Sequence, residues 1–144
     1  MTTPEGVTVS GHLPAWAQDD PSRTGVPLRL LPIRLADISH QAHFPGQTMQ
    51  VVAPDAHGAA GEETLFDAVV ECCPYAEHPE PRVPVANIQV HPEHWILGLT
   101  PDGLADLASQ LRRQADRLDN DVRPALITAR TDWARHHPPA PTPT

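Results

Sequence analysis

Proline is the residue that most restricts what this chain can fold into. The sequence of 144 residues contains 18 prolines, which occur in both halves of the chain. A proline lacks the backbone N–H and clashes with the preceding helical turn, so it interrupts both helices and central strands. The sequence therefore predicts many short segments and argues against an all-helical bundle.

Composition limits the size of the core and the kind of partner. Hydrophobic residues make up 40% of the chain, which is enough for the single modest core of one domain. Aromatic residues make up only 4%, so aliphatic side chains must fill most of that core. The net charge of −8 repels phosphate backbones, and we therefore expect no nucleic-acid partner.

The sequence also indicates a compartment. No apolar run approaches the roughly 18–20 residues that a bilayer-spanning helix needs. The first ten residues, MTTPEGVTVS, show neither the basic region nor the apolar region of a secretory signal. We therefore expect a cytoplasmic protein without a membrane partner.

The clearest regular element begins at Thr100, a good helix N-cap, followed by Pro101 at the first helical position. Apolar residues then recur with the period of an α-helix and form one stripe. Its members are Leu104, Leu107, Ala108, Leu111, Ala115, Leu118 and Val122. The stripe stays in phase beyond Pro124, although a proline inside a helix costs about 3 kcal/mol. One kinked helix and a pair of helices both remain open, and the retained phase favours the kinked helix.

Shorter apolar runs precede this helix and predict strands. The run 64–73 fits either a helix or a strand, and its valines, short length and final Pro74 favour a strand. Residues 54–63 have the composition of a loop. The expected strands are 27–38, with Pro32 at a sheet edge or bend, 47–53, 64–73, 83–91 and 94–99.

These elements predict an α+β fold, in which a small, mainly antiparallel sheet of about five strands is followed by one or two C-terminal amphipathic helices. We expect residues 1–11 to form an N-terminal arm and 12–137 a single α+β domain. Residues 138–144 have the composition of a disordered, proline-rich tail.

Several motifs resemble those of a known family. In order, they are HLPAWAQDDPS, LADISH, FPGQTM, CPYAEHPEPRVPV and WILGLTPDGLADLASQLRRQADRL. The set is similar to an uncharacterised family of small actinobacterial proteins, classed as a domain of unknown function, over about residues 12–137. Many members carry cysteines on both sides of the early tryptophan, where this chain has Ala15 and Ala17. The resemblance implies an α+β domain and brings no established activity, cofactor or catalytic residue.

A group of cysteine and histidine residues is the first candidate site. Zinc takes four ligands of these types in a tetrahedron, and Cys73, His78, His91 and His94 form such a set if the two strands that carry them pair. The alternative, which we prefer, is structural: Cys72 fills the core, Cys73 is a partly exposed thiol, and His91 and His94 flank a hairpin turn. We therefore expect no cofactor, with zinc as the alternative.

A second candidate is a polar site formed by Asp37, His40 and His43. Ser39 lies among them, so all three residue types of a Ser–His–Asp triad are present. Adjacency in sequence is not triad geometry, and no nucleophile elbow surrounds Ser39. A strand end turning into a loop, with Asp37 and Ser39 bonded to nearby backbone, is the structural alternative.

The distal part of the helix is the third candidate, as an interface formed by Val122, Leu126, Ala129 and Trp133. Aromatic residues such as Trp133 dominate binding hot spots, and packing of this part of the helix on the chain's own sheet is the structural alternative. We therefore predict a non-enzymatic interaction or regulatory module, with a protein partner or with homodimerisation through the C-terminal helix. The alternative is a metal-binding protein or metal-dependent enzyme that uses the Cys/His cluster.

Overall fold

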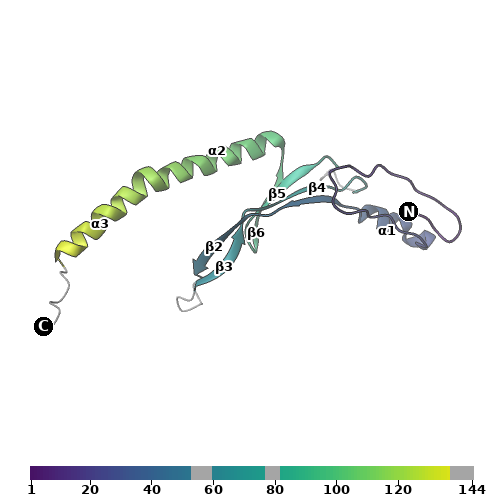
Figure 1. Cartoon of the computed structure of the whole chain (residues 1–144). Coiled ribbons are helices and arrows are strands. Elements are labelled where there is room, and N and C mark those ends of the chain that lie inside the picture. Colours follow the sequence, from purple (N-terminus) through teal and green to yellow (C-terminus); the bar gives the residue numbers. More distant parts are fainter. Residues whose placement is uncertain (53–59, 77–81, 137–144) are drawn as a thin grey trace. The chain divides into compact units, whose positions relative to one another are not determined.

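The computed structural model describes residues 1–52, 60–76 and 82–136 (Figure 1). The chain divides into two compact units, Met1–Asp102 and Gly103–Thr144. The first unit carries all the described strands, and the second carries most of the C-terminal helix. None of the helices in the described ranges combines the length and the apolar composition needed to cross a membrane.

The first unit begins with irregular chain and two short helices, followed by six strands. Its elements are η1 (Leu28–Leu30), α1 (Leu31–Ala36), β1 (His40–Phe44), β2 (Gln47–Val52), β3 (Ala60–Leu65), β4 (Asp67–Cys72), β5 (Val85–His91) and β6 (His94–Leu99). A four-stranded sheet has the order β1-β4-β5-β6, and β2 and β3 form a second sheet. All pairs are antiparallel, so the predicted α+β class is confirmed, with six strands in two sheets.

The strands β1 to β4 form one long hairpin. Residues 45–46 on one arm and residue 66 on the other interrupt its strands in the middle, and we call this place the corner. The β1–β4 pairs run from His40↔Cys72 to Phe44↔Ala68, and the β2–β3 pairs continue from Gln47↔Leu65 in the same register. The hairpin therefore has two long arms, 40–52 and 60–72, although residues 53–59 lie outside the described ranges.

The corner depends on two unusual positions. Phe66 has a φ of 63°, a left-handed conformation that is uncommon for a residue with a side chain. Opposite it, the backbone of Gly46 lies so close to the other arm that a Cβ there would collide with the Leu65 carbonyl oxygen. The Gly46 N–H donates a hydrogen bond of 2.8 Å to Asp67 Oδ1, which fixes the two arms together. The strand predicted over 64–73 is thus interrupted at Phe66.

The strand predicted over 27–38 is wrong, because this segment forms η1 and α1. Pro32 lies in the first turn of α1, where a helix tolerates proline because the missing N–H has no helical partner. The helical period buries Leu31 and leaves Ile33 57% exposed, whereas an alternating strand would place both on one face. The loop predicted over 54–63 is also corrected in part, since Ala60 to Glu63 belong to β3.

The core of the first unit is small and lies between one sheet face and the N-terminal segment. The sheet contributes small or aliphatic residues from three strands, and the segment before β1 contributes larger aliphatic ones. The buried apolar residues are Val26, Leu31, Ile38, Ala42, Cys72, Ala86 and Ile88. The residues predicted as an N-terminal arm are tied to this unit, because Thr2 O accepts a 3.1 Å hydrogen bond from Val26 N.

The second unit is a long helical segment with a π turn in its middle. The segment comprises α2 (Pro101–Arg117), whose first two residues belong to the first unit, followed by η2 (Leu118–Val122) and α3 (Arg123–His136) (Figure 1). In η2, Arg123 N donates to the carbonyl of Leu118, five residues back. The wider turn lies directly before Pro124, whose ring would otherwise clash with the carbonyl four residues earlier. The structure therefore has one continuous helical segment that passes through the proline.

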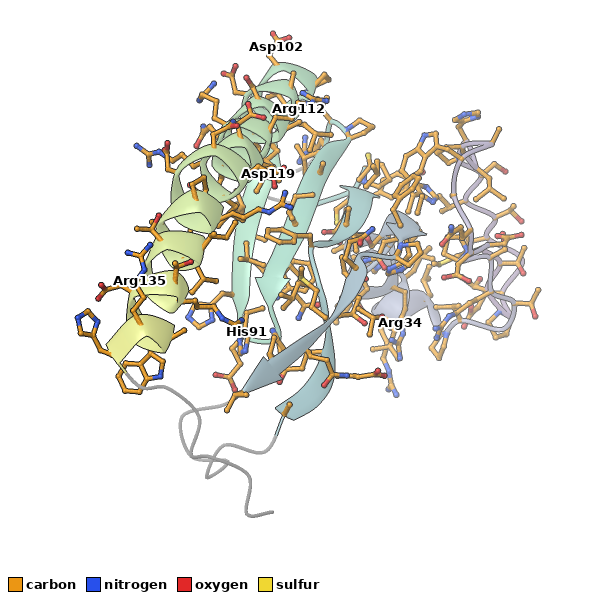
Figure 2. All side chains as sticks on the ribbon, turned by 60° about the vertical axis from the view of Figure 1, so that its left-hand side comes forward. Arg34, His91, Asp102, Arg112, Asp119 and Arg135 are labelled. Carbon is orange, nitrogen blue, oxygen red and sulfur yellow. The ribbon has the colours of Figure 1, made fainter. Side chains whose placement is uncertain are left out.

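Charged side chains of both signs follow the helix along its length. Asp102, Arg112, Asp119 and Arg135 mark this distribution (Figure 2). Arg123 and Asp119 approach to 3.7 Å across one turn.

The corner of the hairpin provides a direct test of this fold. We expect Gly46→Ala to lower the free energy of unfolding by about 1–3 kcal/mol, because the new methyl group must displace backbone atoms. Denaturant unfolding followed by circular dichroism measures this change. Gly61→Ala is the matched control in β3, where a Cβ meets nothing within 4 Å, and it should be neutral or slightly stabilising. Equal effects of the two substitutions would contradict the proposed role of Gly46.

Candidate functional site

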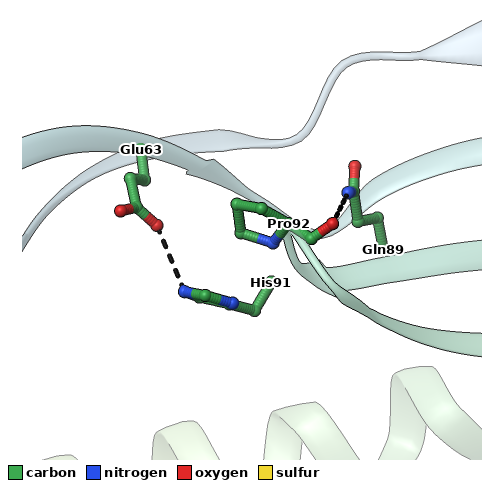
Figure 3. Close-up of polar contacts among 4 residues, drawn as sticks. All are labelled: Glu63, Gln89, His91 and Pro92. Carbon is green, nitrogen blue, oxygen red and sulfur yellow. Dashed lines mark hydrogen bonds and ion pairs between the residues drawn. The ribbon is translucent and has the colours of Figure 1, made fainter. Parts of the chain in front are cut away.

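His91 and His94 lie at the turn between β5 and β6. The two residues are paired in the strand register, and their ring centroids are 5.8 Å apart. His91 Nε2 lies 3.4 Å from Glu63 Oε2 of β3, and Gln89 donates a 2.9 Å hydrogen bond to the Pro92 carbonyl (Figure 3). These contacts hold the turn and connect it to the second sheet.

The structure does not bring Cys73 to this histidine pair. The β4–β5 register pairs Glu71 with Val85, so Cys73 follows β4 at one end of the pair while His91 ends β5 at the other. From Val85 to His91 a strand rises by about 20 Å, whereas zinc needs all its ligand atoms within about 2.3 Å. The fourth predicted ligand, His78, lies outside the described residues. Within the ranges that the structure describes, no cluster of three or more His, Cys, Asp or Glu side chains has metal-binding geometry.

The adjacent cysteines have different environments. Both are free thiols, Cys72 buried and Cys73 half-buried. The Cys72 thiol donates to the Arg82 carbonyl at 3.3 Å, and Cys73 Sγ lies 3.9 Å from Glu71 Oε1. Burial raises the pKa of the Cys72 thiol, and the neighbouring Cys73 adds to the shift. Cys72 therefore stays protonated as core filler, which agrees with the structural alternative.

The polar set of Asp37, His40 and His43 is dispersed. Asp37 follows α1 and forms an exposed ion pair with Arg34 at 3.7 Å. His40 and His43 are both in β1, but an odd separation places their side chains on opposite faces of the sheet. His40 is only 5% exposed, and His43 is exposed. The three residues therefore do not form one site.

His40 instead lies in the wall of a cavity beside the N-terminal segment. The cavity has a volume of about 60 Å³, and its polar lining includes His12, Asp20, Ser22 and Tyr75. Trp16 contacts His40 edge to face, with 6.5 Å between the ring centroids. The buried Nδ1 of His40 has no hydrogen-bond partner among the described residues. A cavity of this size has room for a few water molecules.

Asp20 adds a negative charge to the lining of this cavity. Ser22 N donates a 2.9 Å hydrogen bond to Asp20 Oδ1. Hydrogen bonds from Ser22 hold the pKa of the Asp20 carboxyl below its usual value, so the group is ionised near neutral pH. Nothing in the sequence pattern pointed to Asp20, because its relation to His40 depends on how the N-terminal segment crosses the sheet.

A row of polar side chains crosses the face of the four-stranded sheet that lies opposite the core. This row was not predicted from the sequence. Glu71 Oε1 accepts hydrogen bonds from Ser39 at 2.8 Å and Gln41 at 3.1 Å, and Oε2 accepts one from Asn87 at 3.0 Å. Asn87 Oδ1 in turn accepts from Gly98 N at 2.9 Å. The row connects β1, β4, β5 and β6, so Glu71 holds strands in register. Ser39, predicted to bond locally, bonds to a residue 32 positions away.

The third predicted site, on the helix, consists of exposed side chains. Val122, Leu126 and Trp133 are 53%, 56% and 64% exposed, and Ala129 is also exposed. Leu104, Leu111 and Leu118 on the same helix are 38%, 42% and 53% exposed. These residues form an exposed apolar face of the helical segment.

The fold is that of a small α+β protein with two antiparallel sheets and a long C-terminal helix. The chain belongs to the family described as Domain of unknown function (DUF6907), whose profile matches residues 1–128. The match extends from the N-terminal segment through the π turn into α3. No curated protein and no solved structure matched the chain.

The two cysteines give a test that depends on pH. Because burial raises the pKa of Cys72, the native chain holds this proton more tightly than the unfolded chain. The protonated Cys72 thiol contributes fully to the free energy of unfolding below the usual thiol pKa of about 8.5. This contribution is lost as the pH rises through the raised pKa of the folded chain. We expect Cys72→Ala to remove part of the fall in unfolding free energy above about pH 8.5, measured by denaturant titration at several pH values.

Cys73→Ala is the matched control, because this thiol is only half-buried. It should keep most of the alkaline fall in stability. An unchanged alkaline slope in Cys72→Ala would contradict the assignment of this thiol to the core.

Proposed function

We propose that the chain is a non-enzymatic interaction or regulatory module that contacts a protein, either another protein or a second copy, through the apolar face of its C-terminal helix. The observation that carries this proposal is the exposure of large apolar side chains in one helical segment, from Leu104 at 38% to Trp133 at 64%. The free thiols Cys72 and Cys73 suit the reducing cytoplasm, which we propose as its location.

The energetics of the helix support a contact role. Helices have a costly nucleus and draw most of their stability in proteins from packing an amphipathic face. Burying one leucine side chain contributes about 1.5–3 kcal/mol. Covering Leu104, Leu111 and Leu118 would therefore stabilise a complex by several kcal/mol before the cost of association is counted.

The polar side chains of the first unit support a structural rather than a catalytic role for that unit. Both oxygens of Glu71 accept hydrogen bonds from neighbouring strands. His91 is held against Glu63 at a turn, and His40 lies in the wall of a cavity of only about 60 Å³. These groups position strands and the N-terminal segment.

The proposal predicts that association depends on two leucines. We expect Leu111→Ser combined with Leu118→Ser to weaken the chain's complexes about tenfold or more, because covering two leucines that are 42% and 53% exposed contributes at least about 1.5 kcal/mol. Native mass spectrometry and sedimentation of the untagged full chain, alone and with co-purifying proteins, measure these complexes.

The matched control is Arg113→Ser combined with Asn120→Ser. These residues have the same spacing and lie two positions beyond the leucines, on the other side of the helix. The control should keep every complex, and circular dichroism checks that both variants remain helical. Complexes that survive loss of both leucines would contradict the proposal.

A further inference from the structure

The large apolar residues of the helix follow the spacing of a coiled-coil seam when the π turn is taken into account. Leu104, Leu111 and Leu118 are seven residues apart, as are Leu126 and Trp133 beyond the turn. The step from Leu118 to Leu126 is eight. One i→i+5 turn takes up about one residue more than an α turn, so the later residues are set back onto the same seam.

Smaller side chains occupy the alternate positions of this seam. Ala108 and Ala115 each follow a leucine of α2 by four residues, and Val122 follows Leu118 by four residues through the wider π turn. Leucines alternating with small residues allow a second helix to approach closely, with its leucines seated over the small residues. The seam is therefore complementary to an inverted copy of itself.

Resting on the proposed function, we propose that the occupant of this seam is a second copy of the chain, paired antiparallel. In this pairing, Leu118 of each copy lies opposite Ala115 of the other, and Leu111 lies opposite Val122. Beyond the π turn, Leu126 lies opposite Ala108 of the other copy. The pairing is two-fold symmetric and closed, as most homodimer interfaces are.

Charge complementarity selects this register. Arg112 and Asp119 each follow a seam leucine by one residue, on the same flank of the helix (Figure 2). In the antiparallel pairing, Arg112 of one copy faces Asp119 of the other, and the symmetry forms this ion pair twice. If one copy is shifted by one heptad along the other in one direction, Arg112 of each copy faces Arg112 of the other. If it is shifted in the other direction, Asp119 faces Asp119 and Asp121 faces Asp121. Flanking charges of this kind set orientation and register in coiled coils.

A parallel pairing lacks this complementarity. In register, it places Arg112 beside Leu107 and Asp119 beside Gln114 of the other copy, so neither charge meets its opposite. It also aligns the two helix dipoles, whereas the antiparallel pairing opposes them.

Asp119 has a partner within its own chain, which the dimer must accommodate. Its Oδ1 lies 3.7 Å from Arg123 Nη1, and the two side chains are 75% and 72% exposed. An ion pair this exposed is weak and does not bar Asp119 from a second arginine. Arg123 can remain beside the new pair.

The first test reverses the two charges in the full chain. We expect Arg112→Asp and Asp119→Arg each to raise the dimer dissociation constant about tenfold, since each turns two attractions into two repulsions. The double variant should recover the original affinity, measured by sedimentation equilibrium at fixed ionic strength. Arg113→Asp is the matched control, one residue away but off the seam, and should have little effect.

The second test places cysteines on the flank of the seam in the Cys72→Ala, Cys73→Ala background. An Arg112→Cys chain mixed with an Asp119→Cys chain should form a mixed disulfide under mild oxidation. The matched control replaces the first chain by Ala105→Cys, which lies one heptad earlier on the same flank. Only a dimer shifted by one heptad would join Ala105→Cys to Asp119→Cys.

The outcomes separate this inference from the proposed function. A dimer that weakens with each single reversal and recovers in the double variant supports the antiparallel pairing. A dimer that needs Leu111 and Leu118 but ignores both reversals, or that prefers the Ala105→Cys cross-link, overturns it and leaves the helix as the contact element. A full chain that stays monomeric at every concentration overturns the self-pairing, and a complex with a different protein would then still satisfy the proposed function.

Discussion

A lone helix can be amphipathic, but it cannot bury its own apolar face, and this constraint governs the C-terminal third of the protein. Leucines at 104, 111 and 118 would be ordinary core residues in a bundle. Here they belong to a single helical segment and are 38–53% exposed. The π turn before Pro124 lets the helix pass the proline. In the pairing that we propose, it also sets Leu126 and Trp133 back onto the seam of the leucines. The proline that seemed to divide this segment is instead accommodated inside it.

The first unit does bury a core, but it must fill that core largely with small side chains. Alanines, Cys72 and a few aliphatic residues fill the space under the sheet. Polar interactions take a large share in fixing the strands, with Glu71 accepting hydrogen bonds from two neighbouring strands and from Ser39 just before β1. Gly46 and Phe66 let one hairpin bend into both sheets. Two of the hollows in this unit are the cavity of about 60 Å³ beside His40 and a wider one of about 450 Å³ beside Phe44 and Trp95.

The parts of this structure that sequence could predict are those set by local period. The helix from Pro101 and the strands 47–52, 85–91 and 94–99 each show their period over several residues, and the structure has them at those places. The strand predicted around Pro32 was wrong because a proline that limits a strand also suits the first turn of a helix.

The site predictions depended on long-range register instead. Cys73 and His91 belong to neighbouring elements, yet the antiparallel pairing sends them to opposite ends, and only the same register reveals that Gln41, Glu71 and Asn87 meet. The break at Phe66 follows from the close approach of Gly46, which no local pattern encodes.

The central claim is that the helix owes its stability to a second copy of the chain that covers its apolar face. Amide hydrogen exchange of residues 104–133, measured over a hundredfold range of protein concentration, tests this claim most directly. The account predicts that protection of the helical amides rises with concentration of the chain, while protection in β4 and β5 stays constant. Helical amides that are equally protected at every concentration, in the purified chain with no other protein present, would contradict it.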